Sequence, residues 1–233
     1  MRFEQVNYFS ICTETMSERS QQKPIVFVVD DDISVRESVE LLIRFAGWQP
    51  EMFASAEEFL ACPSRVGPSC LVLDVSLPNL SGLDLQKLIT ADHADMPIIF
   101  ITGHGDVPMT VRAMKAGAVE FLTKPFDDEV LLSAMRHAIK RSMAVLDGQA
   151  ELRALHSSYE SLTSREQEVL RLVVAGMLNK QIGVKLGISE ITVKAHRGKM
   201  MQKMKADSVA DLVKTAVRLG LTPARNPWHT TES

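Results

Sequence analysis

Acidic side chains stand at the ends of two short apolar segments of the 233-residue chain. Ile25–Asp30 is rich in β-branched residues and leads into Asp31, and Cys70–Asp74 ends in a carboxylate. Such segments are typical of buried strands in a parallel sheet, whose carboxyl ends share one edge. We therefore expect Asp30, Asp31 and Asp74 to lie close together. Their like charges repel, and a divalent cation that prefers oxygen ligands, such as Mg²⁺, would relieve this repulsion.

Two further apolar segments each deliver a group that can contact a phosphoryl group. Pro97–Thr102 ends in a hydroxyl, and Val119–Thr123 is followed by the ammonium of Lys124. A carboxylate acceptor, a cation, a hydroxyl and an ammonium are together what phosphoryl transfer to Asp74 requires. The alternative is that the aspartates only cap loops and helices. It stays open for Asp32, because Asp is favoured at helix starts.

Strand and helix patterns alternate from Pro24 to about Arg141. The expected strands are Ile25–Asp30, Gln49–Phe53, Cys70–Asp74, Pro97–Thr102 and Val119–Thr123. The expected helices are Ser34–Phe45, Ala56–Ala61, Gly82–Ala91, Val107–Ala116 and Asp127–Met143. Five strands alternating with five helices predict an α/β domain in which helices cover both faces of a parallel sheet.

Four separated motifs in this segment occur in the order found in the receiver domain of two-component response regulators. The motifs are Val28-Val29-Asp30-Asp31-Asp32, Leu73-Asp74 followed by Leu77-Pro78 and Ser81-Gly82, Thr102-Gly103-His104, and Lys124-Pro125-Phe126. The chain resembles this domain over about Pro24–Met143. From Thr102 to Phe126 it is especially similar to the FixJ group, which includes the StyR and TodT regulators.

The resemblance implies a flavodoxin-like, doubly wound sheet with strand order 2-1-3-4-5 and a role for each pocket residue. Asp74 would accept the phosphoryl group, which Thr102 and Lys124 would contact. Phe121 would swing inward when Thr102 moves, as one side of a two-state equilibrium that phosphorylation biases. Mg²⁺, or Mn²⁺ in its place, would be held directly or through water by oxygens of Asp30, Asp31, Asp74 and the backbone carbonyl of Ser76.

In the last third of the chain the pattern changes to short helices alone. The expected helices are Ser164–Ala175, Asn179–Leu186, Glu190–Met204 and Ser208–Leu219. Thr163 and Glu166 match a capping box at the first helix, and Gly187–Ser189 forms a tight turn as in a helix-turn-helix. We interpret the preceding segment, Lys140–Tyr159, as a helical linker that Gly148 breaks.

The third of these helices is expected to have one packed face and one face open to a DNA groove. Val193, Met200 and Met204 recur at helical spacing and predict the packed face. Small residues at Ala195 and Gly198 permit close approach to a groove floor. Basic side chains suited to phosphates or bases are Lys180, Lys194, His196, Arg197 and Lys199.

The segment from about Ser158 to Gly220 resembles the LuxR-type, or NarL/FixJ, DNA-binding domain. The matching residues include Leu162-Thr163-Ser164-Arg165-Glu166, Asn179-Lys180-Gln181-Ile182, Leu186-Gly187-Ile188-Ser189 and Thr192-Val193-Lys194. The resemblance implies a four-helix domain whose third helix enters the major groove. Base edges would face Lys194, Ala195 and Gly198, and phosphates would contact Thr192, Arg197 and Lys199. The fourth helix would offer a dimer surface through Leu212, Val213 and Val217.

The formal net charge of -3 combines two parts of opposite sign. Residues 1–156 hold 14 Lys+Arg and 22 Asp+Glu, which gives -8, whereas residues 157–233 hold 12 and 7, which gives +5. The basic part coincides with the helix-turn-helix, as DNA binding requires. No apolar run reaches the roughly 18 residues of a membrane span. Three cysteines at irregular spacing show no disulfide or zinc pattern, so we expect a cytoplasmic protein.

We expect a flexible N-terminal extension (1–22), a receiver domain (23–143), a helical linker (144–157), a helix-turn-helix domain (158–222) and a flexible tail (223–233), with Met16 as an alternative start. The chain is predicted to be a response regulator and no enzyme. A histidine kinase would phosphorylate Asp74, and the protein would then dimerise, bind promoter DNA and, with RNA polymerase, activate transcription.

Two alternatives remain. One is a constitutive DNA-binding protein whose first domain binds a ligand or partner without phosphorylation, against which the complete acidic pocket argues. The other is a phosphoryl-transfer enzyme. The chain has neither a Gly-rich phosphate loop nor a hydrolase nucleophile motif, which argues against that class.

Overall fold

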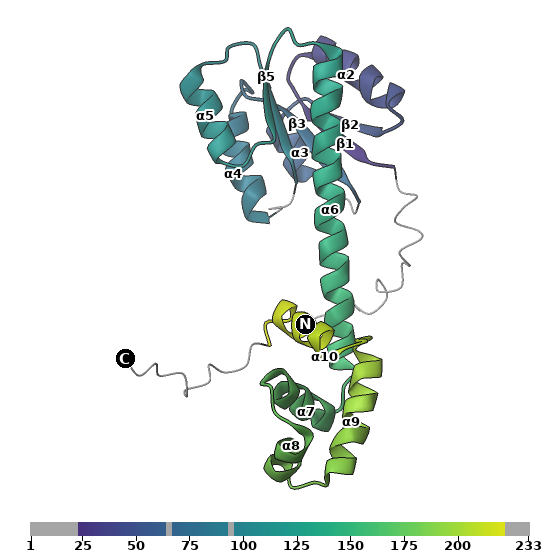
Figure 1. Ribbon diagram of the computed structural model, residues 1–233. Coiled ribbons are helices and arrows are strands. Elements are labelled where there is room, and N and C mark those ends of the chain that lie inside the picture. Colours follow the sequence, from purple (N-terminus) through teal and green to yellow (C-terminus); the bar gives the residue numbers. More distant parts are fainter. Residues whose placement is uncertain (1–22, 64–66, 93–95, 222–233) are drawn as a thin grey trace, which may run out of the picture. The chain divides into compact units, whose positions relative to one another are not determined.

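The computed structural model describes residues 23–63, 67–92 and 96–221, and its first unit contains a five-stranded parallel sheet (Figure 1). The strands are β1 (Ile25–Val29), β2 (Gln49–Phe53), β3 (Ser69–Asp74), β4 (Ile98–Thr102) and β5 (Glu120–Thr123). Their order is β2-β1-β3-β4-β5, and every neighbouring pair is parallel. The predicted fold class is confirmed. The order reverses between β1 and β3, the point at which open α/β sheets bind ligands.

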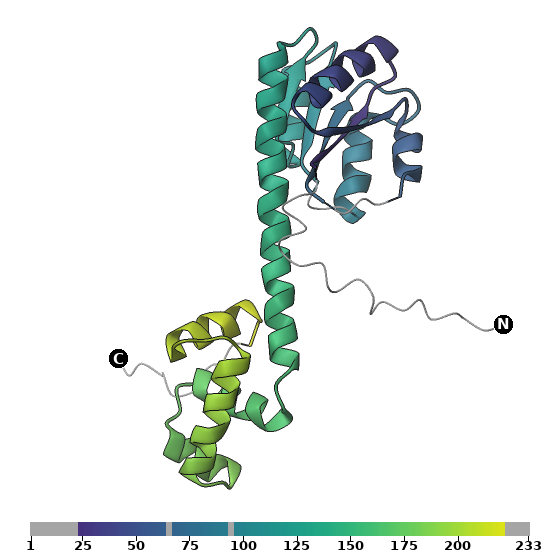
Figure 2. The same ribbon diagram turned by 90° about the vertical axis from the view of Figure 1, so that its right-hand side faces the viewer.

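Helices cover both faces of this sheet (Figures 1 and 2). One face packs against α2 (Ile33–Phe45) and the first half of α6 (Asp128–Glu160). The other face packs against α3 (Ala56–Ala61), α4 (Gly82–Asp92) and α5 (Val107–Lys115). Successive strand side chains point to opposite faces, so the residues of β1 divide between the two cores. All of β3 is buried, as expected for a central strand covered on both sides.

Short polar side chains determine where the helices on the sheet begin. The Oδ1 atom of Asp32 accepts a hydrogen bond from the backbone N–H of Ser34 at 2.8 Å and caps α2. Ser55 and Asp106 cap α3 and α5 in the same way. Each cap satisfies a backbone donor that the first helical turn leaves unpaired. Asp32 therefore has the capping role that the sequence left open.

α6 continues without interruption through Gly148 to Glu160. The predicted break at Gly148 is therefore wrong. An interior glycine costs a helix about 1 kcal/mol relative to alanine, but it keeps its backbone N–H, so the helix can pass through it. The chain divides into two compact units between Leu146 and Asp147, so the two parts of α6 belong to different units.

The second unit contains four short helices after α6. They are α7 (Ser164–Val174), α8 (Asn179–Leu186), α9 (Glu190–Lys203) and α10 (Val209–Arg218). Val193, Met200 and Met204 are buried, which confirms the packed face predicted for the third helix. Leu212 is also fully buried in this core. Its predicted place on a dimer surface is therefore wrong, because the side chain packs into the core of this unit, whereas Val217 is 55% exposed.

Local geometry determines the path between the helices of this unit. The predicted capping box is present: Glu166 N–H donates to the Thr163 hydroxyl at 3.3 Å, and Thr163 N–H donates to the Glu166 carboxylate at 2.9 Å. Gly187 ends α8 in the left-handed conformation with a φ of 67°. A Cβ on Gly183 would lie 2.7 Å from the carbonyl oxygen of Ile188. The absence of a side chain at Gly183 therefore permits the tight turn between α8 and α9.

Within residues 23–63, 67–92 and 96–221, no helix is both long enough and apolar enough to cross a membrane. The predicted flexible extension (1–22), with Met16 and Cys12, and the predicted tail (223–233) lie outside the described residues. Cys62 and Cys70 are free thiols, and Cys70 is buried.

Candidate functional site

A lysine joins two carboxylates at the carboxyl edge of the sheet. Lys124, directly after β5, places its Nζ atom 2.7 Å from Oδ2 of Asp30 and 2.7 Å from Oδ2 of Asp74. Asp30 follows β1 and is fully buried, and Asp74 ends β3 and is 4% exposed. Asp31 is exposed, and one carboxylate oxygen from each of the three aspartates lies within 4.8 Å of the others. The structure thus brings together the residues that the sequence placed at separate strand ends.

Backbone groups hold the two buried carboxylates in place. The Oδ1 atom of Asp30 accepts from the N–H of Asp32 at 2.9 Å, and Oδ1 of Asp74 accepts from the N–H of Ser76 at 2.8 Å. The guanidinium of Arg36 donates to the carbonyl oxygen of Asp30 at 2.6 Å. Arg36 was not predicted from the sequence. Its position one helical turn into α2 was the available signal, because that places its side chain over the end of β1.

Burial and charge have opposite effects on the ionisable groups here. Burial raises the pKa of the Asp30 carboxyl above its ordinary 3.8, and the hydrogen bonds from Lys124 and Asp32 oppose this only in part. Burial alone would lower the pKa of Lys124, but its hydrogen bonds to Asp30 and Asp74 outweigh burial and raise that pKa above 10.5. Lys124 therefore stays charged at neutral pH and offsets part of the repulsion between the carboxylates.

Thr102, at the end of β4, is fully buried, and its hydroxyl bonds to the loop that follows. The hydroxyl accepts from His104 N–H at 3.2 Å and donates to the His104 carbonyl at 3.3 Å. A Cβ on Gly105 would lie 2.9 Å from Cγ2 of Thr123 and 3.3 Å from the ring of Phe121. The loop thus passes closely over Phe121, whose ring is half-buried beside that of Phe100. The sequence analysis missed Gly105, since only tertiary packing shows this close approach.

The donor set of the pocket suits Mg²⁺. Asp30, Asp31 and Asp74 offer only hard oxygen ligands, and their separations leave room for an ion that keeps several of its waters. The ion would add positive charge to that of Lys124 and so further reduce the repulsion between the carboxylates. Ser76 is exposed next to this cluster, and the structure gives no bond from its carbonyl to the other pocket residues.

A second group of candidate residues lies on α9. Thr192, Lys194, Ala195, Gly198 and Lys199 are exposed, whereas His196 and Arg197 are half-buried. Ser189 caps the helix by accepting from the N–H of Thr192 at 3.1 Å. This open helix start, followed by basic residues, is compatible with contact to DNA phosphates.

Two of the basic side chains of α9 that were predicted to contact DNA, Lys194 and Arg197, have protein partners. Lys194 Nζ lies 3.2 Å from Oε1 of Glu190, one turn earlier on the exposed face. Arg197 donates from Nη1 to the side-chain oxygen of Asn179, at the start of α8. Arg197 is thereby directed toward the α8 start, near the exposed Lys180, rather than outward from the middle of α9. The predicted contact of Arg197 with phosphate remains a prediction.

The chain combines two features that define a protein class. One is a doubly wound domain with a lysine–carboxylate pocket at its switch point, and the other is a basic helix-turn-helix. Such a protein is a regulator that combines an acidic signal-receiving pocket with a DNA-binding unit. Comparison with known families gives the same class. The response regulator receiver domain matches residues 26–136, and the luxR family of bacterial regulatory proteins matches residues 160–216. The chain belongs to the two-component response regulators with a LuxR-type DNA-binding domain.

Similar proteins match over nearly the whole chain. Nodulation protein W of Bradyrhizobium diazoefficiens is 50% identical over 86% of this chain and 88% of its own. Response regulator protein TodT of Pseudomonas putida (strain F1) is 45% identical over 89% of this chain and 92% of its own. The solved structure of response regulator StyR has a TM-score of 0.76 and 47% identity, and the match covers 84% of this chain and all of that one. The resemblance to the FixJ, StyR and TodT group is therefore confirmed.

This membership establishes the general function. The protein is a two-component response regulator that regulates transcription, and its relatives are transcriptional regulators rather than enzymes. The two domains imply a histidine kinase and DNA as partners. Receiver domains generally bind Mg²⁺ at an acidic pocket, which in this chain is the cluster of Asp30, Asp31 and Asp74.

Proposed function

We propose that Asp74 is the phosphoryl acceptor of this regulator. The observation that carries the proposal is that Lys124 Nζ bonds both Asp74 and the buried Asp30 at 2.7 Å, with Asp31 beside them. A carboxylate oxygen of Asp74 attacks the phosphorus of a kinase phosphohistidine. The P–N bond breaks, its electron pair returns to the imidazole, and an acyl phosphate forms. Lys124 then contacts the phosphoryl oxygens, while its bond to Asp30 keeps it in place.

The proposed ligands for the cation are Asp30, Asp31, Asp74 and the carbonyl of Ser76, directly or through water. When bound there, Mg²⁺ would supply positive charge for the phosphoryl oxygens. Mn²⁺ is proposed to substitute, since it prefers the same oxygen ligands and octahedral geometry.

The proposed switch runs from Thr102 to Phe121. The Thr102 hydroxyl now bonds the backbone of His104, and it would leave this loop to contact a phosphoryl oxygen on Asp74. Movement of the loop would change the contacts of Gly105 over Phe121, and the ring would turn inward. Phosphorylation would thus bias an equilibrium between two arrangements of the same residues.

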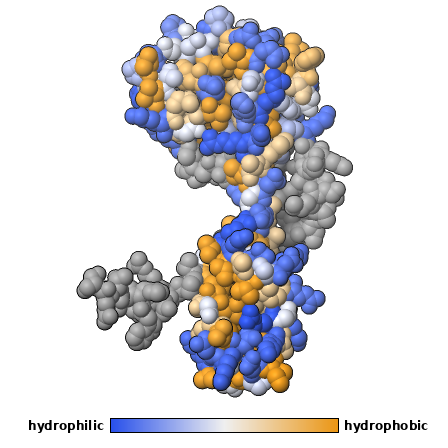
Figure 3. Space-filling view, viewed as in Figure 1, coloured by the Kyte–Doolittle hydropathy of each residue, from blue (hydrophilic) through white to orange (hydrophobic). Residues whose placement is uncertain are grey.

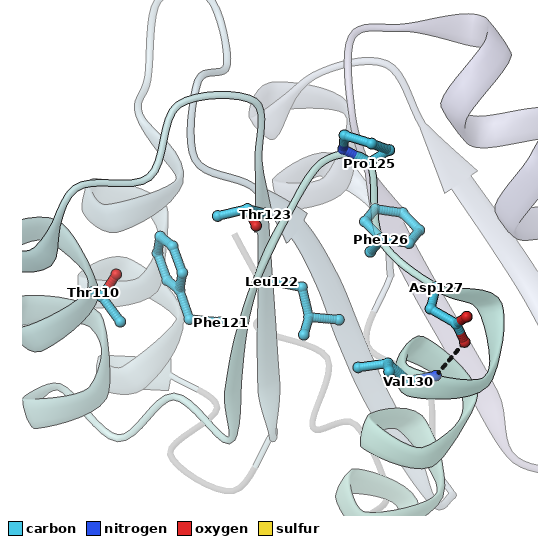
Figure 4. Close-up of a pocket in the computed structure, with 8 residues that line it drawn as sticks. All are labelled: Thr110, Phe121, Leu122, Thr123, Pro125, Phe126, Asp127 and Val130. Carbon is cyan, nitrogen blue, oxygen red and sulfur yellow. Dashed lines mark hydrogen bonds between the residues drawn. The ribbon is translucent and has the colours of Figure 1, made fainter.

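The face of α5 and β5 is proposed to pair two receiver domains after phosphorylation. Three apolar side chains of α5 are exposed there: Val107 by 77%, Val111 by 43% and Met114 by 42%. Figure 4 shows a hollow along β5, with Phe121 on the α5 side and Phe126 and Val130 on the α6 side. Exposed apolar surface beside a switch residue suits an interface that the switch controls.

The DNA-binding unit is proposed to bind a two-fold promoter site as a dimer. Figure 3 shows hydrophobic residues gathered over α10, where Val217 is exposed and Val213 half-buried, and we assign the dimer contact to these two residues without Leu212. The proposed DNA contacts are Lys180, Thr192, Lys194, Ala195, His196, Arg197, Gly198 and Lys199. The bound dimer would recruit RNA polymerase and activate transcription. Because the promoter is its target, the protein would act in the cytoplasm.

Substitution of Asp74 by Asn tests the proposal. The variant should lose labelling by radioactive acetyl phosphate with Mg²⁺, and it should lose phosphate-dependent dimerisation in analytical ultracentrifugation. Asp84→Asn is the matched control, because Asp84 is an exposed carboxylate that bonds its helix neighbours Ser81 and Lys87. Labelling that survives in Asp74→Asn would place the acceptor elsewhere. DNA binding that is equally strong with and without acetyl phosphate would favour the constitutive DNA-binding alternative.

A further inference from the structure

The outermost face of α9 is apolar at its centre. Val193 and Met200 are fully buried. With about 100° of rotation per residue, Ile191, Ala195 and Gly198 lie on the opposite side of the helix from Val193. Ile191 is 80% exposed, and a Cβ on Gly198 would meet no atom within 4 Å. As far as Gly198, the side of the helix farthest from the core therefore presents a branched aliphatic side chain, a methyl group and bare backbone, and the exposed Gln202 follows on the same side.

Two polar side chains of α9 next to this strip have partners within the protein. Arg197, the only arginine of α9, bonds Asn179 on α8. Lys194 is paired with Glu190 on the flank of the exposed face. Family resemblance places Lys194, Ala195 and Gly198 against base edges, and of these Ala195 and Gly198 have no side-chain donor or acceptor. At Ile191, Ala195 and Gly198, sequence discrimination must therefore use a base feature other than a hydrogen-bonding edge.

The C5-methyl group of thymine is the apolar feature of the major groove, and aliphatic side chains recognise it by contact. We propose that Ile191, with Ala195 beside it, reads a thymine methyl and is a specificity-determining residue of this protein. The inference rests on the proposed promoter binding and names its recognition chemistry. Charge supports DNA as the occupant, since Lys194 and Lys199 flank the apolar strip and are exposed.

The experiment begins with the binding site. Full-length protein treated with acetyl phosphate and Mg²⁺ selects sites from a random duplex library. Each thymine of the selected duplex is then replaced singly by uracil, which removes only the methyl group. At one thymine per half-site, the replacement should raise the Kd of the wild-type protein about fourfold, the effect of losing one buried methyl-sized contact.

In Ile191→Ala, the same replacement should change the Kd much less, because the contacting side chain is already gone. Val184→Ala is the matched control: Val184 is 81% exposed on α8 of the same unit, and its removal should leave the thymine-to-uracil ratio at the wild-type value. Both positions are exposed, so neither substitution should affect folding.

The outcomes separate the two hypotheses. If the wild-type protein enriches no sequence, the proposed promoter binding fails and the inference fails with it. Promoter binding stands and the role of Ile191 is refuted by either of two results. Either the wild-type protein selects a site for which no uracil replacement changes the Kd, or Ile191→Ala retains the full dependence of the Kd on the methyl group. Loss of the dependence in Val184→Ala would also refute it, because the methyl contact would then lie on α8.

Discussion

Gly82, the first residue of α4, is the position where a single methyl group should most directly disturb the pocket of the proposed acceptor, Asp74. A Cβ at this position would lie 2.3 Å from the carbonyl oxygen of Asp74 and 3.0 Å from Cα of Val75. Both atoms are backbone, so no side chain can rotate away. The N–H of Gly82 also donates to the carbonyl of Val75 at 3.0 Å, which holds the two segments together. Gly82→Ala must therefore separate α4 from the end of β3 by about 1 Å to restore a normal contact.

The expected consequences are a loss of stability and a loss of reactivity. Overpacking of this kind costs about 1–3 kcal/mol, which urea unfolding followed by circular dichroism will measure. The displacement reaches Asp74 itself, and a misplacement of about 1 Å at a reacting group can slow a reaction by roughly 100-fold. We therefore expect acetyl phosphate to label Gly82→Ala at least about tenfold more slowly than the wild type, under conditions where the variant is folded.

Gly148→Ala is the control for this experiment. Gly148 lies within α6, and a Cβ there would meet no atom within 4 Å. Because α6 is continuous, alanine should stabilise the helix by up to about 1 kcal/mol and leave labelling unchanged. If Gly82→Ala unfolds at the wild-type urea concentration and is labelled at the wild-type rate, the close contact between Gly82 and Asp74 does not position the acceptor, and the reasoning is refuted.

Three further predictions concern the rest of the molecule. Gly183→Ala should lower the stability of the DNA-binding unit by about 1–3 kcal/mol, because its Cβ would lie 2.7 Å from the Ile188 carbonyl; retention of the wild-type melting curve would contradict this. Hydrogen bonds from Lys203 and Thr163 lower the pKa of the Glu166 carboxyl below its ordinary 4.5. The stability that the charged Glu166 contributes to the fold is therefore complete above pH 4.5 and is lost as pH falls through the lowered pKa. Glu166→Gln should lower the free energy of unfolding by about 1 kcal/mol at pH 7. The free energy of unfolding, measured with urea at a series of pH values, should then fall less steeply in acid than that of the wild type. An unchanged fall would show that another group titrates. Burial raises the pKa of Cys70 to about 12, so a thiol reagent at pH 8 should label Cys70 only after unfolding, as peptide mass spectrometry can determine.

Much of the fold follows from local patterns in the sequence. The five strands were predicted from apolar runs bounded by turns, and each was found within one or two residues of its expected ends. The acidic pocket was predictable for the same reason. Once strands are parallel, their carboxyl ends share an edge, and Asp30, Asp74 and Lys124 then come together although they lie far apart in the chain.

The errors came from features that depend on neighbours in space. Gly148 has the propensity of a helix breaker, but propensity is a weak effect, and a long helix can pass through one glycine. Leu212 was assigned to a surface because the sequence shows that α10 has an apolar stripe, but not which part of that stripe the core covers. Periodicity determines which residues share a face, whereas packing determines which face is buried.

Residue types and their order by themselves therefore determined the class of protein and the opposite charges of its two parts, and they predicted the phosphoryl chemistry. Tertiary structure decided the contacts that no local pattern contains. These include the close approach of Gly82 to Asp74, the loop at Gly105 over Phe121, and the bond that directs Arg197 to Asn179. Each contact joins segments that approach one another only when the helices and strands pack. Because side-chain contacts act over a few ångströms, these residues meet their partners only in the folded chain.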